Sequence, residues 1–132
     1  CKGFFKSVMN HGLCRVLRER KGQDAFLSAE DLSLMPLVSL HQGFTAVALL
    51  NIAHAERNGH HYSFGQRQLT TREQQLARQH HPDLYTRRKA DLFLNIQRGK
   101  VRCDSLQCPG FGVKFEPEWE KLTSLAKWKV LW

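Results

Sequence analysis

A helix start and a helix stop lie close together between Thr70 and Pro82, and they constrain the fold more than any other feature of the sequence. Thr70 and Glu73 form a capping box, in which each side chain can bond the backbone N–H of the other residue. Pro82 disfavours helical geometry at the residue before it, so a helix that begins after Thr70 must end near His81. Leu76 and its neighbours form a weakly apolar face. The sequence therefore predicts a short helix that packs along one edge.

Two longer helices are predicted nearer the N-terminus. Residues 3–21 repeat apolar side chains at helical spacing and are followed by a glycine, a natural helix stop. Residues 37–57 form a broad apolar surface that ends at the Asn-Gly pair 58–59, and we expect this segment to be the core helix. Between these segments, Ser28 is a candidate N-cap for a short turn of helix that Pro36 ends.

The C-terminal half predicts another helix, a hairpin and a terminal helix. Residues 86–98 combine a basic first turn with inward-facing apolar residues. Alternating residues in 100–103 and 111–115, joined through a Pro-Gly turn, predict a β-hairpin. Residues 116–132 predict a terminal helix, whose tryptophans need a partner surface in the protein's own core or on another protein. The expected fold is mainly α: a single domain over residues 1–132, comprising a helical bundle, a small C-terminal β-hairpin and the terminal helix.

Positive charge is the most informative bulk property, because 20 Lys and Arg stand against 12 Asp and Glu, for a net charge of +8. The excess lies in two blocks, residues 1–22 and residues 57–102. Such blocks attract phosphate backbones or anionic lipid, whereas the alternative interpretation is that they serve solubility alone. We expect them to bind nucleic acid, RNA rather than DNA. The predicted contacts are Arg15, Arg18, Lys21, Arg67, Arg72, Arg78, Arg87, Arg88, Lys89, Arg98, Lys100 and Arg102.

The preferred phosphate contacts are the consecutive cations Arg87, Arg88 and Lys89. In the first turn of a helix over residues 86–98, they would oppose the positive end of the helix dipole. A phosphate bound there would relieve this repulsion, because backbone N–H groups and guanidinium groups converge at a helix start. The alternative is that these charges are only solvated.

Cys103 and Cys108 lie close together on the predicted C-terminal hairpin. They could form half of a zinc knuckle, and His60 and His80 are the imidazoles chosen to complete its tetrahedron, with His61 or Cys14 as alternatives. The two cysteines could equally form a local disulfide in an oxidising compartment, or remain free thiols. The spacing leaves all three states open.

Two histidine motifs resemble those of known families. His60 and His61 follow a glycine, as in the Gly-His-His motif of ββα-metal nucleases, and the resemblance implies one metal ligand and one general base. The alternative is an exposed polar loop. His81-Pro82-Asp83 resembles the signature loop of J-domain co-chaperones, which implies that an antiparallel helix follows and that the loop contacts an Hsp70 ATPase domain. The alternative is a helix stop with a solvent-facing His81, whose replacement by Gln would be nearly silent.

The sequence favours a non-catalytic, basic, nucleic-acid-associated protein, either alone or as a subunit or regulator in a larger assembly. A metal-dependent nuclease and a J-domain-like co-chaperone are the alternatives. The chain begins with Cys1 rather than Met, so we expect a processed form or part of a longer chain. No apolar run is long enough to predict a membrane span, and an intracellular protein is favoured over a secreted one.

Overall fold

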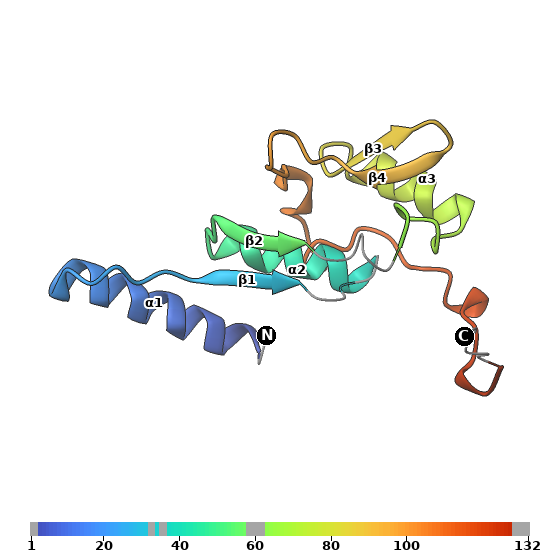
Figure 1. Cartoon of the computed structure of the whole chain (residues 1–132). Helices are drawn as coiled ribbons and strands as arrows, with labels where there is room; N and C mark the ends of the chain where they lie inside the picture. The colour runs from blue at the N-terminus through green and yellow to red at the C-terminus, as the bar shows by residue number, and fades with distance from the viewer. Residues whose placement is uncertain (1–2, 32–33, 35–36, 58–62, 128–132) are drawn as a thin grey trace.

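The computed structural model describes residues 3–31, 34, 37–57 and 63–127 (Figure 1). Within these described residues, three α-helices, two small two-stranded sheets and short 3₁₀ turns follow one another. The mainly α composition is therefore confirmed. Among the described residues, no helix combines the length and apolar character that crossing a membrane requires.

Helix α1 spans Phe4–Lys21, as its apolar spacing predicts. It ends at Gly22, which adopts the left-handed conformation and donates its backbone N–H to the carbonyl oxygen of Arg18 at 3.2 Å. None of the residues of α1 is buried, so this helix contributes no side chain to the core.

Strand β1 (Ser28–Asp31) occupies the segment where Ser28 predicted a helix start, so that prediction is wrong. It pairs in parallel with strand β2 (His54–Arg57), with Ser28 opposite His54 and Glu30 opposite Glu56. Pairing with a distant segment has overridden the local capping signal.

Helix α2 spans Val38–Leu49 and is shorter than the predicted helix 37–57. The chain leaves the helix at Leu50 and Asn51, whose φ of 49° is a left-handed conformation that Asn tolerates better than most residues. The last residues of the predicted helix belong instead to β2, and its predicted stop at 58–59 lies outside the described residues.

Helix α3 spans Thr71–His80, and its predicted capping box is confirmed. The Thr70 hydroxyl accepts from the Glu73 N–H at 3.1 Å, and the Glu73 carboxylate accepts from the Thr70 N–H at 2.8 Å. The same carboxylate accepts from the Glu118 N–H at 2.9 Å, and the Glu118 carboxylate accepts from the Thr70 hydroxyl. The C-terminal segment is thereby fixed to the positive end of the α3 dipole.

A β-hairpin replaces the helix predicted over residues 86–98. Strand β3 (Tyr85–Arg88) and strand β4 (Asp91–Leu94) pair antiparallel through a two-residue turn in which Lys89 has a φ of 56°. Tyr85 and Leu92 are buried on one face, so the segment follows the period of two of a half-buried strand. The short apolar run within residues 86–98 fits both a helix and a strand, and its prediction as a helix is wrong.

The predicted C-terminal hairpin and terminal helix are also wrong within the described residues. The segments 100–103 and 111–115 form no strands, and Asp104–Leu106 between them is a 3₁₀ turn, η2. The last described segment contains only the 3₁₀ turns η3 (Trp119–Lys121) and η4 (Leu125–Lys127). The hydrogen bonds that hold Glu118 against Thr70 and Glu73 at the start of α3 compete with the hydrogen bonds of a continuous terminal helix.

The core lies among the start of α2, helix α3, the β3–β4 hairpin and the loop 101–115. Its contiguous buried residues are Leu37, Leu69, Ala77, Leu84, Tyr85, Leu92 and Leu106. Figure 1 shows α3 and the hairpin on one side of α2, and α1 with β1 on the other. The core therefore combines helix, hairpin and loop rather than facing helices alone.

Candidate functional site

Two fully buried histidines meet between α2 and the end of α3. His41 and His81 are both 0% exposed, and their ring centroids lie 4.5 Å apart in an edge-on arrangement. His41 Nε2 is 2.8 Å from the Tyr85 hydroxyl oxygen, and His81 Nδ1 is 3.1 Å from Ser105 Oγ. The pair thus links α2, the end of α3, the hairpin and turn η2.

Both histidines are held in the neutral state. Burial, together with the nearby His81, lowers the pKa of His41 to about 3. Burial also lowers the pKa of His81 to about 4, assisted by the positive charge of Lys114. Because neither ring reaches solvent, neither can exchange a proton with a substrate. The buried pair instead connects the elements that surround it through polar contacts.

Asp83 closes the His81-Pro82-Asp83 loop onto turn η2. Its Oδ2 atom accepts from the Ser105 backbone N–H at 3.1 Å. Burial raises the pKa of Asp83, but hydrogen bonds from Ser105 and the loop backbone outweigh it, so the pKa lies below its ordinary value. The carboxylate is therefore charged at neutral pH and holds the loop closed.

These contacts correct the interpretations of this loop. His81 is buried, so the predicted solvent-facing position, on which the expectation of a nearly silent replacement rests, is wrong. The J-domain resemblance implies an antiparallel helix after Asp83, whereas the hairpin Tyr85–Leu94 follows. The side chain on which a J-like contact would depend is buried beneath the chain's own residues.

The predicted zinc ligands do not gather in the described part of the chain. There, no group of at least three His, Cys, Asp or Glu side chains could hold a metal ion. Burial, with Asp83 and Asp104 nearby, raises the pKa of Cys103 to about 11. His80 stacks on Phe115, with ring centroids 5.7 Å apart.

The other predicted cysteine states are a local disulfide and a zinc site completed by further residues. Cys103 and Cys108 are free thiols, so the local disulfide is wrong. Cys14, the alternative ligand, is likewise a free thiol. His60 and His61 lie outside the described residues, so the zinc site that includes His60 and the nuclease motif both stay predictions.

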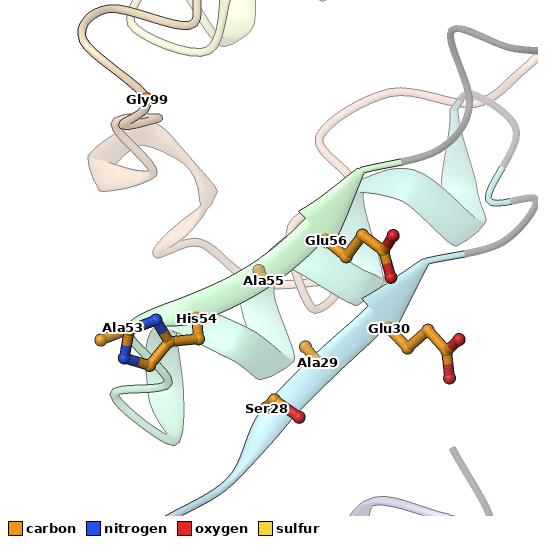
Figure 2. Close-up of a pocket in the computed structure, with 8 residues that line it drawn as sticks. All are labelled: Ser28, Ala29, Glu30, Ala53, His54, Ala55, Glu56 and Gly99. Atoms are coloured by element: carbon orange, nitrogen blue, oxygen red, sulfur yellow. The ribbon is translucent and has the colours of Figure 1, made fainter.

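A shallow depression over the β1–β2 sheet is acidic (Figure 2). Glu30 and Glu56 are register partners on adjacent strands, and their carboxylates lie side by side in Figure 2. His54, predicted to lie on the core helix, is exposed on β2, with its ring 5.8 Å from that of Phe26. Two neighbouring carboxylates repel a phosphate, so this depression disfavours an anionic ligand.

A second hollow lies between α3 and β3 and is cationic. It is lined by Gln75, Arg78, Gln79 and Arg87, and we call it the α3–β3 hollow. It brings together two residues from the predicted nucleic-acid set that lie on different elements. Neither arginine forms an ion pair with another described residue. Their guanidinium groups therefore remain available to an anion.

The other predicted contacts divide into two groups. Carboxylates already engage Arg15, Arg67, Arg72 and Arg102. The cations without an ion pair in the described part of the chain, beside those of the hollow, are Arg18, Lys21, Arg88, Lys89, Arg98 and Lys100. Arg87, Arg88 and Lys89 lie on a hairpin, so the helix-dipole argument for a phosphate there no longer applies.

Two aromatic rings and two guanidinium groups gather on the outside of the hairpin, and we call this set the outer hairpin face. Phe64 and Phe93 meet edge to face at 5.2 Å. The Arg67 guanidinium lies 4.5 Å from the centre of the Phe64 ring, and the Arg88 guanidinium lies 5.5 Å from that of Phe93. Sequence reasoning missed this face; the Phe64-x-x-Arg67 spacing was its only local signal.

The comparisons with known proteins add no relative. No family model, curated protein or solved structure matches the chain.

Proposed function

We propose that the chain is a non-catalytic, basic protein that associates with nucleic acid, with RNA preferred over DNA, either alone or as a subunit of a larger assembly. The observation that carries the proposal is the α3–β3 hollow, which Arg78 and Arg87 both line without an ion pair to another described residue. Two guanidinium groups at one hollow suit a phosphate, because each presents a planar fork of donors.

The glutamines of the hollow support the same ligand. Gln75 and Gln79 lie one turn apart on α3 and line the hollow together with the arginines. Their amide groups can donate to phosphate or ribose oxygens without adding charge. Contacts of this kind give affinity and register, and they carry no sequence preference by themselves.

The preference for RNA rests on the outer hairpin face. Phe64 is 59% exposed, so its ring is open to an unpaired base. Unpaired bases in RNA loops and single strands stack on aromatic rings and on guanidinium planes. A single strand can place phosphates near free cations such as Arg88 and Lys89 while its bases reach the rings, whereas the bases of a duplex are already stacked.

The zinc knuckle and the predicted protein partner remain subordinate proposals. A zinc site would require His60 in addition to Cys103, Cys108 and His80, and metal analysis of the purified protein tests it directly. A protein partner would contact the tryptophan-containing C-terminal segment, where Trp119 is 55% exposed.

The test is binding of a labelled single-stranded RNA and of a labelled DNA duplex over a series of salt concentrations. Arg78→Gln/Arg87→Gln should weaken RNA binding and reduce the slope of log K against log salt by about 1.4, because each lost phosphate contact removes about 0.7 on a single strand. The matched control, Arg15→Gln/Arg102→Gln, removes the same charge from arginines that carboxylates already engage.

The two variants separate a site from a general charge effect. A control that lowers the slope as much as the test variant would remove the hollow from the interface. Phe64→Ala should weaken RNA binding by about 1–3 kcal/mol without changing the slope, since stacking releases no counterions. Equal affinity for duplex DNA and single-stranded RNA would overturn the RNA preference.

A further inference from the structure

Helix α1 exposes its apolar residues. Phe5, Met9 and Leu13 are 87%, 74% and 56% exposed. These residues recur four apart, so they form a stripe along one face of the helix, and Val8 and Val16 extend it. An exposed apolar stripe of this length on a folded chain marks an interaction surface.

The opposite face of α1 is the one turned toward the rest of the chain. The half-buried residues of α1 are Ser7, His11, Cys14 and Leu17, which share that face. Phe4, at the start of the helix, meets Phe111 edge to face at 5.3 Å. In Figure 1, α1 runs beneath β1 at the edge of the molecule, far from α3 and the hairpin. The stripe is therefore separate from the proposed RNA-binding surfaces.

Positive charge flanks the stripe. Helix α1 carries five basic residues, Lys6, Arg15, Arg18, Arg20 and Lys21, against the single acidic residue Glu19. At about 100° per residue, Lys6 and Arg15 lie roughly 90° to either side of the centre of the stripe. Long basic side chains at the border of an apolar face can keep their charged ends in the headgroup region while the face is buried.

We infer that α1 binds in the plane of a membrane surface rich in anionic lipid. Phe5, Met9 and Leu13 enter the boundary between headgroups and acyl chains, and cations such as Lys6 and Arg20 meet the lipid phosphates. Charge complementarity selects this occupant: a second copy of the helix would bring two sets of cations together, and a nucleic acid would leave the stripe in water.

The experiment is sedimentation of the full chain with vesicles of phosphatidylcholine alone and of phosphatidylcholine mixed with phosphatidylglycerol. We expect binding to the anionic vesicles and little to the neutral ones. Phe5→Ser/Met9→Ser/Leu13→Ser should lower the partition coefficient at least about tenfold. The matched control Leu49→Ser/Ile96→Ser/Leu122→Ser removes apolar residues of comparable exposure elsewhere and should leave binding within about twofold of the unmodified chain.

A second variant tests the electrostatic part while it leaves the stripe intact. Lys6→Gln/Arg20→Gln should reduce binding to anionic vesicles about tenfold or more, because each cation near such a surface contributes about 1 kcal/mol. Arg78→Gln/Arg87→Gln changes a distant surface and should retain at least half of the vesicle binding.

Three results would overturn the inference. The first is equal binding of the unmodified chain and the stripe variant to anionic vesicles. The second is equal binding of the unmodified chain to neutral and anionic vesicles. The third is a lipid-free dimer that the stripe variant abolishes, since a second copy would then cover the stripe.

Discussion

Acid should destabilise this protein because two buried histidines must stay neutral for the chain to remain folded. His41 and His81 are fully buried, and burial lowers their pKa values to about 3 and about 4, from an ordinary value of 6.5. In the unfolded chain both rings take up protons near pH 6.5. Above that pH both rings are neutral in the folded and in the unfolded chain, so the histidines do not lower the free energy of unfolding. As the pH falls below it, the unfolded state binds protons that the folded state does not, and the free energy of unfolding decreases.

The size of the effect follows from the pKa values. Each histidine lowers the free energy of unfolding by about 1.4 kcal/mol per pH unit between its unfolded and folded pKa values. For two histidines, the loss between pH 7.5 and pH 5 is about 4 kcal/mol, compared with a total of about 5–15 kcal/mol for a typical domain. Asp83 and Glu118 have lowered pKa values, so their contributions are lost mostly below the ordinary carboxyl values of 3.8 and 4.5. They do not account for a loss above pH 5.

Urea unfolding at pH 7.5 and pH 5, followed by circular dichroism, measures this difference. His81→Gln should be less stable at pH 7.5, because it disrupts a buried contact, and should show about half of the acid-induced loss. His54→Gln is the control, because His54 is exposed. Equal stability of the unmodified chain at the two pH values would refute the reasoning. Titration of the His41 or His81 ring resonances between pH 7.5 and pH 5 in the folded protein would also refute it.

Three further predictions concern stability and thiol reactivity. Thr70→Ala should cost about 1–2 kcal/mol in urea unfolding, because the capping box and the bond to the C-terminal segment are lost together, and the exposed Thr71→Ala should change little. Leu92→Ala should cost about 2–5 kcal/mol at a fully buried position, whereas Ile96→Ala should stay within about 0.5 kcal/mol; similar costs would contradict the location of the core. Cys103 should react more slowly with iodoacetamide at pH 8 in the folded protein than in urea, by peptide mass spectrometry, because burial raises its thiol pKa to about 11; equal rates would contradict that burial.

The predicted nucleic-acid residues show how far charge alone can guide a site. Sequence reasoning named Arg78 and Arg87 among many cations, and it could not show that they share one hollow. It also included Arg67, whose bidentate pair with Asp91 joins residues 24 positions apart. Which cations are free depends on where the carboxylates lie in three dimensions, and a sequence does not reveal that.

The sequence by itself determined the elements whose signals lie within a few residues of one another. The helix from Thr71 to His80 is fixed by a capping box at one end and Pro82 at the other. Helix α1 is fixed by its apolar spacing and a glycine stop. The capping box at the start of α3 and the Gly22 N–H at the end of α1 both bond to atoms within about one turn, so the local chain contains these interactions.

Only the tertiary structure decided the strands, the state of the histidines and the C-terminal segment. Ser28–Asp31 became a strand because His54–Arg57 lies beside it, and a strand needs a partner that its own residues do not specify. His81 is neutral because the folded chain buries its ring, and Glu118 turns toward α3 because Thr70 and Glu73 provide its hydrogen bonds. Burial and pairing between distant residues are properties of the folded chain, since each partner acquires its environment only when the other is in place.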